Sequence, residues 1–139
     1  MLGDVSDARV LDLYCGTGAL GIEALSRGAG SAVFVDSERS AVALAEANLD
    51  LTAGERGRVV REDALVFLGR SGALYDLVFA DPPYDSASRL GERLSERLPA
   101  VLAPGGRIVT ESDKRNPLEL SLPLVRERTY GDTRIAIHG

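Results

Sequence analysis

The chain has 139 residues, of which 45% are hydrophobic and 27% charged, which predicts one globular domain over residues 1–139 and excludes wholesale disorder. A single cysteine excludes an internal disulfide framework and a Cys-rich zinc site, and with neither a long apolar run nor an N-terminal targeting signal we expect a cytoplasmic protein without membrane contact. The formal net charge of -5 lacks the basic footprint of most nucleic-acid binders, so any contact with nucleic acid must come from a local patch.

Short apolar runs alternate with amphipathic runs along the chain. Strands are predicted, in chain order, over residues 8–15, 31–36, 58–61, 75–80, 107–111, 124–130 and 133–138. Helices are predicted over residues 19–27, 38–51, 64–68 and 86–102, with Pro99 kinking or restarting the last. We expect an irregular loop over residues 112–123. This alternation predicts a doubly wound, Rossmann-like α/β fold with a mostly parallel seven-stranded sheet and an antiparallel C-terminal hairpin.

A glycine-rich loop directly follows the first predicted strand. Residues 16–21 fit the pattern G-x-G-x-x-G and open the first helix, where free backbone N–H groups and the absence of a Cβ let a ligand approach closely. Asp36 ends the second strand, where a carboxylate can accept both ribose hydroxyls of a nucleoside. The spacing predicts an adenosine-containing cofactor, either a dinucleotide held through its pyrophosphate or S-adenosylmethionine.

An acidic residue ahead of the glycines favours S-adenosylmethionine. Asp12 lies four positions before Gly16, where a carboxylate pointing into the crevice would repel a pyrophosphate and suit the cationic amino-acid end of S-adenosylmethionine. Asp63 ends the third strand and can accept the exocyclic amine of adenine. Each feature has a plainer alternative, since the glycines can form a simple turn, and Asp36, Ser37 or Asp63 can cap a helix. The candidate cofactor-binding residues are Asp12, Tyr14, Gly16, Thr17, Gly18, Ala19, Asp36, Ser37, Asp63 and Ala64.

A second motif, Asp-Pro-Pro-Tyr, follows the fourth predicted strand. Two prolines fix the local backbone and aim its carbonyls rigidly. The Asp81 carboxylate and the Pro82 carbonyl can then hold the two hydrogens of an exocyclic base amine, while Tyr84 stacks on an extruded base. The candidate catalytic residues are therefore Asp81, Pro82, Pro83 and Tyr84. The plainer alternative is a turn that merely ends the strand.

Three further residues carry weaker signals. Cys15 is expected to be a small buried residue, since no histidine lies near it in sequence. His138, the single histidine, is assigned no role. Glu111 ends the fifth strand near the same edge and is expected to be a solvated strand end rather than part of a pocket.

Residues 12–29 resemble the cofactor loop of the bacterial 16S rRNA (guanine-N2)-methyltransferases, and the similarity extends over almost the whole chain. Its other elements are Phe34, Val35, Asp36, Asn48, Asp63, Ala64, residues 81–84, Gly105, Gly106 and residues 130–133. The resemblance implies the class I methyltransferase fold, S-adenosylmethionine as cofactor with S-adenosylhomocysteine as product, and no metal. It also implies rRNA or the assembling small ribosomal subunit as partner, and we expect a monomer.

One departure from the family and several alternatives stay open. The family usually carries an arginine-rich segment before the first strand, whereas this chain begins a few residues before that strand. The segment would supply much of the positive surface, and we expect cofactor binding to survive without it. Because the Asp-Pro-Pro-Tyr motif is shared with N6-adenine methyltransferases of DNA or RNA, it does not choose the base. A dinucleotide-dependent oxidoreductase and a catalytically silent binding module are the remaining alternatives.

Overall fold

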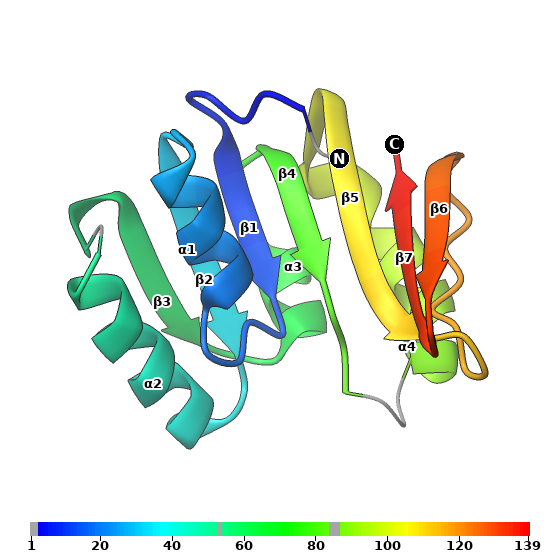
Figure 1. Cartoon of the computed structure of the whole chain (residues 1–139), viewed down its shortest axis with the longest axis horizontal. Helices are drawn as coiled ribbons and strands as arrows, with labels where there is room; N and C mark the ends of the chain where they lie inside the picture. Colours follow the sequence, from blue (N-terminus) through cyan, green and yellow to red (C-terminus); the bar gives the residue numbers. More distant parts are fainter. Residues whose placement is uncertain (1–2, 53, 84–86) are drawn as a thin grey trace.

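The computed structural model describes residues 3–52, 54–83 and 87–139, and in this part of the chain seven strands form one sheet (Figure 1). The sheet order is β3-β2-β1-β4-β5-β7-β6. The strands are β1 Arg9–Leu13, β2 Ser31–Asp36, β3 Gly57–Arg61, β4 Tyr75–Ala80, β5 Leu102–Asp113, β6 Leu124–Tyr130 and β7 Thr133–His138. Strands β1 to β5 pair in parallel, and β7 pairs antiparallel with both β5 and β6. The predicted fold class is confirmed.

Helices cover both faces of the sheet, as right-handed crossovers between parallel strands require. They are α1 Ala19–Ser26, α2 Arg39–Asp50, α3 Ala64–Arg70 and α4 Ala87–Arg97, with short 3-10 turns at Gly54–Arg56 and Leu98–Val101. Helices α1 and α2 lie on one face and α3 and α4 on the other (Figure 1). Pro99 stands in the first turn of the second 3-10 segment, so the predicted interruption of the last helix is confirmed. No helix in the described ranges is long and apolar enough to span a membrane.

Several predicted boundaries are wrong by a few residues. Strand β1 ends at Leu13 rather than at residue 15, because Tyr14 adopts a left-handed φ of 56° that turns the chain out of the sheet. Strand β5 begins well before residue 107, because it pairs with β4 on both sides of an irregularity. Residues 104–106 lie within that irregularity, with Gly105 at a φ of 78°.

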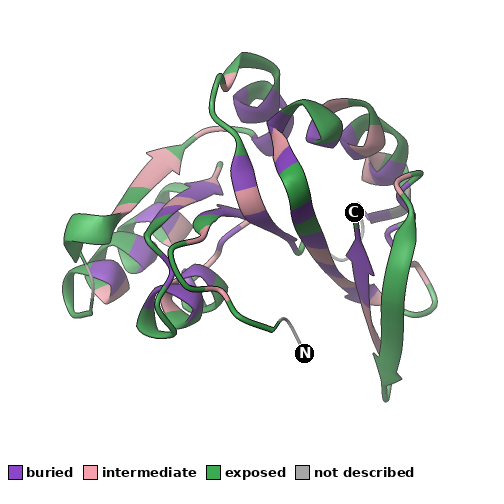
Figure 2. Cartoon of the chain, turned by 90° about the horizontal axis from the view of Figure 1, so that it is seen from above, coloured by how far each residue is buried: buried purple, intermediate pink, exposed green. Residues whose placement is uncertain are grey.

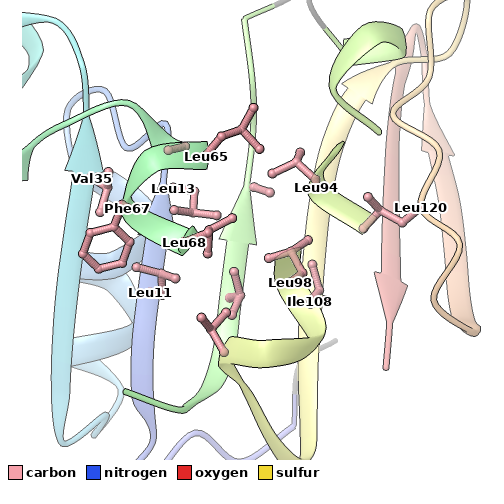
Figure 3. Packing of buried hydrophobic residues seen from close by; sticks show 14 of the residues in the cluster. Leu11, Leu13, Val35, Leu65, Phe67, Leu68, Leu94, Leu98, Ile108 and Leu120 are labelled. Atoms are coloured by element: carbon pink, nitrogen blue, oxygen red, sulfur yellow. The ribbon is translucent and has the colours of Figure 1, made fainter. Parts of the chain in front are cut away.

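Two buried clusters hold the strand ends in place. Alternate side chains of β1 point to opposite faces, so Leu11 and Leu13 join the cluster under α3 and α4, while Val10 joins the one under α1 and α2. Figure 3 shows the first cluster, in which Phe67 of α3 and Leu94 of α4 pack over the sheet. Each fully buried side chain of this size contributes roughly 1.5–3 kcal/mol. The strand ends at the carboxyl edge are therefore firmly placed.

The helices leave part of the sheet uncovered. On the face that carries α1 and α2, no helix in the described residues crosses the β5-β7-β6 portion (Figure 1). Figure 2 gives the same arrangement seen from above and shows β6 exposed along its whole length. This uncovered portion begins beside the carboxyl end of β4.

Candidate functional site

The loop between β1 and α1 makes a sharp turn at the carboxyl edge of the sheet. Gly16 and Gly18 have φ values of 55° and 81°, which glycine adopts without steric cost. Tyr14 shares the left-handed region, where a residue with a side chain carries about 1–3 kcal/mol of strain. Backbone hydrogen bonds fix the turn, with the Gly18 N–H donating to the Cys15 carbonyl at 2.8 Å. Such strain next to a cavity is typical of a functional loop.

Carboxylates of this protein already bind two N–H groups of the loop. The Gly16 N–H donates to Asp36 Oδ2 at 3.0 Å, and the Gly21 N–H in the first turn of α1 donates to Asp12 Oδ2 at 3.1 Å. The Glu38 N–H donates to the other oxygen of Asp36 at 3.0 Å. These loop amides are therefore not free to hold a phosphate.

The third glycine of the motif has a packing role. A Cβ added at Gly21 would lie 2.4 Å from Cε2 of Phe34 in β2, a separation that no side chain could accept without a shift of the ring or the helix. The glycine thus lets α1 lie close on the sheet, which brings the loop next to the end of β2.

A cavity of about 650 Å³ opens beside the loop at the carboxyl ends of the strands, where doubly wound proteins bind ligands. Its lining residues are Tyr14, Gly16, Thr17, Asp36, Ser37, Glu38, Ser40, Ala41, Leu44, Asp63, Asp81, Pro83 and Leu90. The structure therefore brings together eight of the residues singled out in the sequence: Tyr14, Gly16, Thr17, Asp36, Ser37, Asp63, Asp81 and Pro83.

The charged side chains around this cavity are all acidic. They are Asp36, Glu38, Asp63 and Asp81, and no lysine or arginine lines the cavity within the described part of the chain. Behind the loop, burial raises the pKa of Asp12 to about 7; the Gly21 N–H opposes this shift, and the negative charges of Asp81 and Asp36 add smaller raising effects. The carboxylates that line the cavity attract a cationic ligand and repel an anionic one.

The expected position of Asp12 is wrong. Its side chain is only 2% exposed and lies beneath α1, where it accepts the Gly21 N–H instead of lining the cavity. The reason is strand alternation, since Asp12 shares the α1 face of β1 with Val10. Gly18, Ala19 and Ala64 also do not line the cavity, although the two glycine-loop residues shape its wall through the turn.

Two helix-cap alternatives are resolved. Asp63 caps α3, because its carboxylate accepts the Val66 N–H at 3.1 Å, and it also lines the cavity, so the cap does not exclude a contact with a ligand there. Neither Asp36 nor Ser37 is the capping residue of α2, because that helix begins after Glu38.

One wall of the cavity was not predicted from the sequence. It is formed by the first turns of α2, through Glu38, Ser40, Ala41 and Leu44, and by Leu90 of α4. The sequence did contain a signal for this wall. A helix that begins shortly after Asp36 presents its first turns to the carboxyl edge of the sheet, where Asp36 lies. Leu44 lies there with 47% of its surface exposed.

The Asp81 turn connects this cavity with two smaller ones. A cavity of about 340 Å³ is lined by Asp81, Pro82, Pro83, Ala87, Glu111, Ser112, Asp113 and Thr133. The other, of about 150 Å³, is lined by Leu20, Phe79, Ala80, Asp81, Val109, Glu111 and Ile135. Asp81 thus lines the large cavity and both smaller ones. Tyr84 lies outside the described residues.

Asp81 has an altered acidity. The side chain is exposed at the rim, but the surrounding turn displaces enough water to raise the pKa of its carboxyl to about 6, and the nearby charge of Glu111 adds to the effect. Glu111 is half buried and lines the same two cavities, so the expectation that it is only a solvated strand end is wrong. Ala80 and Thr110 are paired across β4 and β5, and each directly precedes one of the two acids. This pairing explains why Asp81 and Glu111 lie together.

The remaining titratable candidates lie away from the cavity. Burial raises the pKa of the Cys15 thiol to about 12, so this buried cysteine is not a nucleophile at neutral pH. His138 is buried in β7, where desolvation and then the charge of Arg134 lower its pKa. The residues that the structure describes contain no group of three or more side chains placed to hold a metal ion.

The fold and the position of the cavity define a doubly wound α/β protein of the Rossmann-like class, with its site at the carboxyl ends of the strands. The chain belongs to the family described as conserved hypothetical protein 95, whose model matches residues 1–139. A solved structure of a conserved hypothetical protein from Streptococcus pyogenes is 34% identical, with a TM-score of 0.84 over 94% of this chain and 84% of that one.

Curated relatives carry names of rRNA-modifying enzymes. The chain is 39% identical over 80 residues to the ribosomal RNA small subunit methyltransferase D of Escherichia coli K12, covering 58% of this chain and 40% of that protein. It is 37% identical over 119 residues to the ribosomal RNA large subunit methyltransferase K/L of Chromohalobacter salexigens, covering 77% of this chain and 16% of that protein. The chain thus spans less than half the length of either relative.

Proposed function

We propose that this chain binds S-adenosylmethionine in the 650 Å³ cavity and transfers its methyl group to an exocyclic amine of an rRNA base, specifically guanine N2 of 16S rRNA. The single observation that carries the proposal is a cavity whose charged lining residues are all acidic and which shares Asp81 with a second cavity of about 340 Å³. On this proposal the partner is rRNA or the assembling small subunit in the cytoplasm.

The residues present fit this cofactor. Asp36 ends β2 with two oxygens that retain lone pairs for a ribose, and Asp63 stands at the end of β3, where an adenine edge would lie. The acidic surroundings suit the positive charges of the sulfonium and the amino group. When bound, the cofactor would supply an electrophilic methyl group.

A pyrophosphate fits the same loop poorly. In dinucleotide-binding proteins the N–H groups of the glycine loop and the helix N-terminus hold the phosphates. Here the Gly16 and Gly21 N–H groups already donate to carboxylates, and further acids line the cavity. A dinucleotide would therefore lose these hydrogen bonds and face like charges, which disfavours the oxidoreductase alternative.

The Asp81 turn would position and activate the target amine. An exocyclic amine is a weak nucleophile because its lone pair is delocalised into the ring. The Asp81 carboxylate and the Pro82 carbonyl can accept its two hydrogens, which localises the lone pair on nitrogen and orients it in line with the methyl group. With a pKa near 6, Asp81 is ionised at pH 7.5 and takes up the released proton more readily than an ordinary aspartate.

The choice of base and subunit rests on resemblance. The name of the Escherichia coli relative supports the small subunit, whereas the name of the Chromohalobacter relative points to the large subunit. Guanine N2 is supported by the resemblance of residues 12–29 to the guanine-N2 family alone. N6-adenine methylation is the second candidate, because the Asp81 turn can hold either amine.

The test is methylation of small-subunit particles with tritiated S-adenosylmethionine, followed by nucleoside analysis. We expect N2-methylguanosine from the wild type, and about a hundredfold lower kcat from Asp81→Ala with unchanged S-adenosylhomocysteine binding. The exposed Asp50→Asn variant serves as control. Full activity of Asp81→Ala would contradict the mechanism, methyladenosine would select the second candidate, and tight cofactor binding without any methylation would select a silent binding module.

A further inference from the structure

The uncovered face of the sheet leads from the Asp81 turn to the edge strand β6. Side chains of directly paired residues share a face, so Glu111 of β5, Ile135 of β7 and Arg128 of β6 form one row across this face. Asp81 and Glu111 line the cavity of about 150 Å³ together with Ile135, which places the turn at the end of the same row. Adjacent strands lie about 4.8 Å apart, so Arg128 stands three strand steps, roughly 14 Å, from Asp81.

Strand β6 separates its side chains by face. Arg126, Arg128 and Tyr130 alternate along the strand and therefore share the uncovered face, opposite Ile137, Ile135 and Thr133 of β7. On the other face, Glu127 pairs with Arg134 at 2.9 Å. Glu127, the acid between the two arginines in the strand, therefore points to the opposite face and is paired there. It does not neutralise Arg126 or Arg128.

These three side chains are available to a partner. All are exposed, and 55% of the surface of Tyr130 is open to solvent. Within the described residues, neither Arg126 nor Arg128 has a side-chain hydrogen bond or ion pair, whereas Arg9, Arg27 and Arg70 all have a carboxylate partner. In a chain with a net charge of -5, two free guanidinium groups beside an exposed aromatic ring form a local basic patch.

The chemistry of the patch matches a single strand of nucleic acid. Guanidinium groups bind phosphate oxygens through paired N–H donors, and an exposed aromatic ring offers a stacking surface to any base. A double helix would bury its bases and could not use the ring. Among the described residues of this row, acids lie at the end far from Arg128, at Asp81 and Glu111, where a base rather than a phosphate would arrive. Asp113, in the row of Tyr130, is paired with Arg115.

We propose that the β6 patch, defined as Arg126, Arg128 and Tyr130, is the surface on which single-stranded RNA lies while one of its bases enters the Asp81 turn. The two arginines contact phosphates, and Tyr130 stacks on a base beside the target. The proposal rests on the proposed function for the role of the Asp81 turn. The alternative occupant of an exposed edge strand is another protein strand, which would use backbone hydrogen bonds rather than these side chains.

The test is fluorescence anisotropy of a labelled, uridine-rich single-stranded oligoribonucleotide with one guanosine, titrated with the protein between about 50 and 200 mM salt. Each phosphate contact to a single strand contributes about 0.7 to the slope of log K against log salt, so R126Q/R128Q should reduce that slope by about 1.4. Tyr130→Ala should weaken binding about tenfold with no change in slope, and Tyr130→Phe should restore it. The matched control is Arg58→Gln, an exposed arginine on the opposite edge strand β3, which should change neither quantity.

The proposal is overturned by no binding of single-stranded RNA by the wild type, by a wild-type slope for R126Q/R128Q, or by an equal effect of Arg58→Gln and Arg128→Gln. It is also overturned, in favour of the protein-strand alternative, if RNA binding is unchanged when the three side chains are replaced but is lost when the backbone edge of β6 is blocked. S-adenosylhomocysteine binding, measured on the same variants, separates a failure of the proposed function from a failure of the RNA-binding surface. If the wild type binds RNA through the patch but binds no S-adenosylhomocysteine, the proposed function fails and the RNA surface stands.

Discussion

The buried carboxyl of Asp12 predicts an unusual dependence of stability on pH. Its pKa is about 7 in the folded protein, against an ordinary value of 3.8 in the unfolded chain. The folded state therefore holds a proton that the unfolded state releases. The stability associated with this group is complete below pH 3.8 and is lost as the pH rises through 7. At about 1.36 kcal/mol per pH unit, the loss amounts to roughly 4 kcal/mol.

The Asp12→Asn variant isolates this effect. Asparagine cannot ionise, and its carbonyl oxygen can still accept the Gly21 N–H that Asp12 accepts at 3.1 Å. We expect the variant and the wild type to have similar free energies of unfolding at pH 4. At pH 8 the variant should be more stable by up to about 4 kcal/mol.

Urea unfolding followed by circular dichroism at a series of pH values measures this difference directly. Other titrating groups are common to both proteins and cancel. Asp50→Asn, at an exposed position of α2, should give a difference that does not vary with pH. A difference between Asp12→Asn and the wild type that is equally constant from pH 4 to 8 would refute a raised pKa for Asp12.

Three further outcomes are expected. Gly21→Ala should lower the free energy of unfolding by about 1–3 kcal/mol, because its Cβ would lie 2.4 Å from the Phe34 ring, and an unchanged urea midpoint would contradict the close packing. Cys15 should react with a thiol reagent at pH 8 only after urea is added, because it is buried with a pKa near 12; rapid reaction of the folded protein would disprove its burial. Asp63→Ala should cost about 1 kcal/mol through loss of the cap on the Val66 N–H and weaken S-adenosylhomocysteine binding, whereas Asp63→Asn should keep most of the stability.

The fold was predictable because its signals are local. Apolar strands alternate with amphipathic helices, and the turn at Gly131 indicates the final antiparallel hairpin. The glycine loop and Asp36 were also predictable, since strand, turn and helix follow one another within a short stretch. The errors at the strand ends had local causes that composition does not show, such as the left-handed backbone of Tyr14.

The site was less predictable wherever it depended on the face to which a side chain points. Asp12 stands in the expected place along the chain, yet strand alternation directs it under α1 instead of into the cavity. Glu111 lines a cavity because β5 and β4 pair in a register that only the sheet determines. The β6 patch follows from the pairing of β6 with β7 and from the absence of a helix over that face, neither of which the sequence spacing reveals.

The proposed cofactor is tested most directly by calorimetric titration of the wild-type chain with S-adenosylhomocysteine, with a nicotinamide dinucleotide as the competing ligand. The account predicts micromolar binding of S-adenosylhomocysteine, at least about tenfold weaker binding to Asp36→Ala, and no heat from the dinucleotide. Binding of the dinucleotide with no response to S-adenosylhomocysteine would contradict the account.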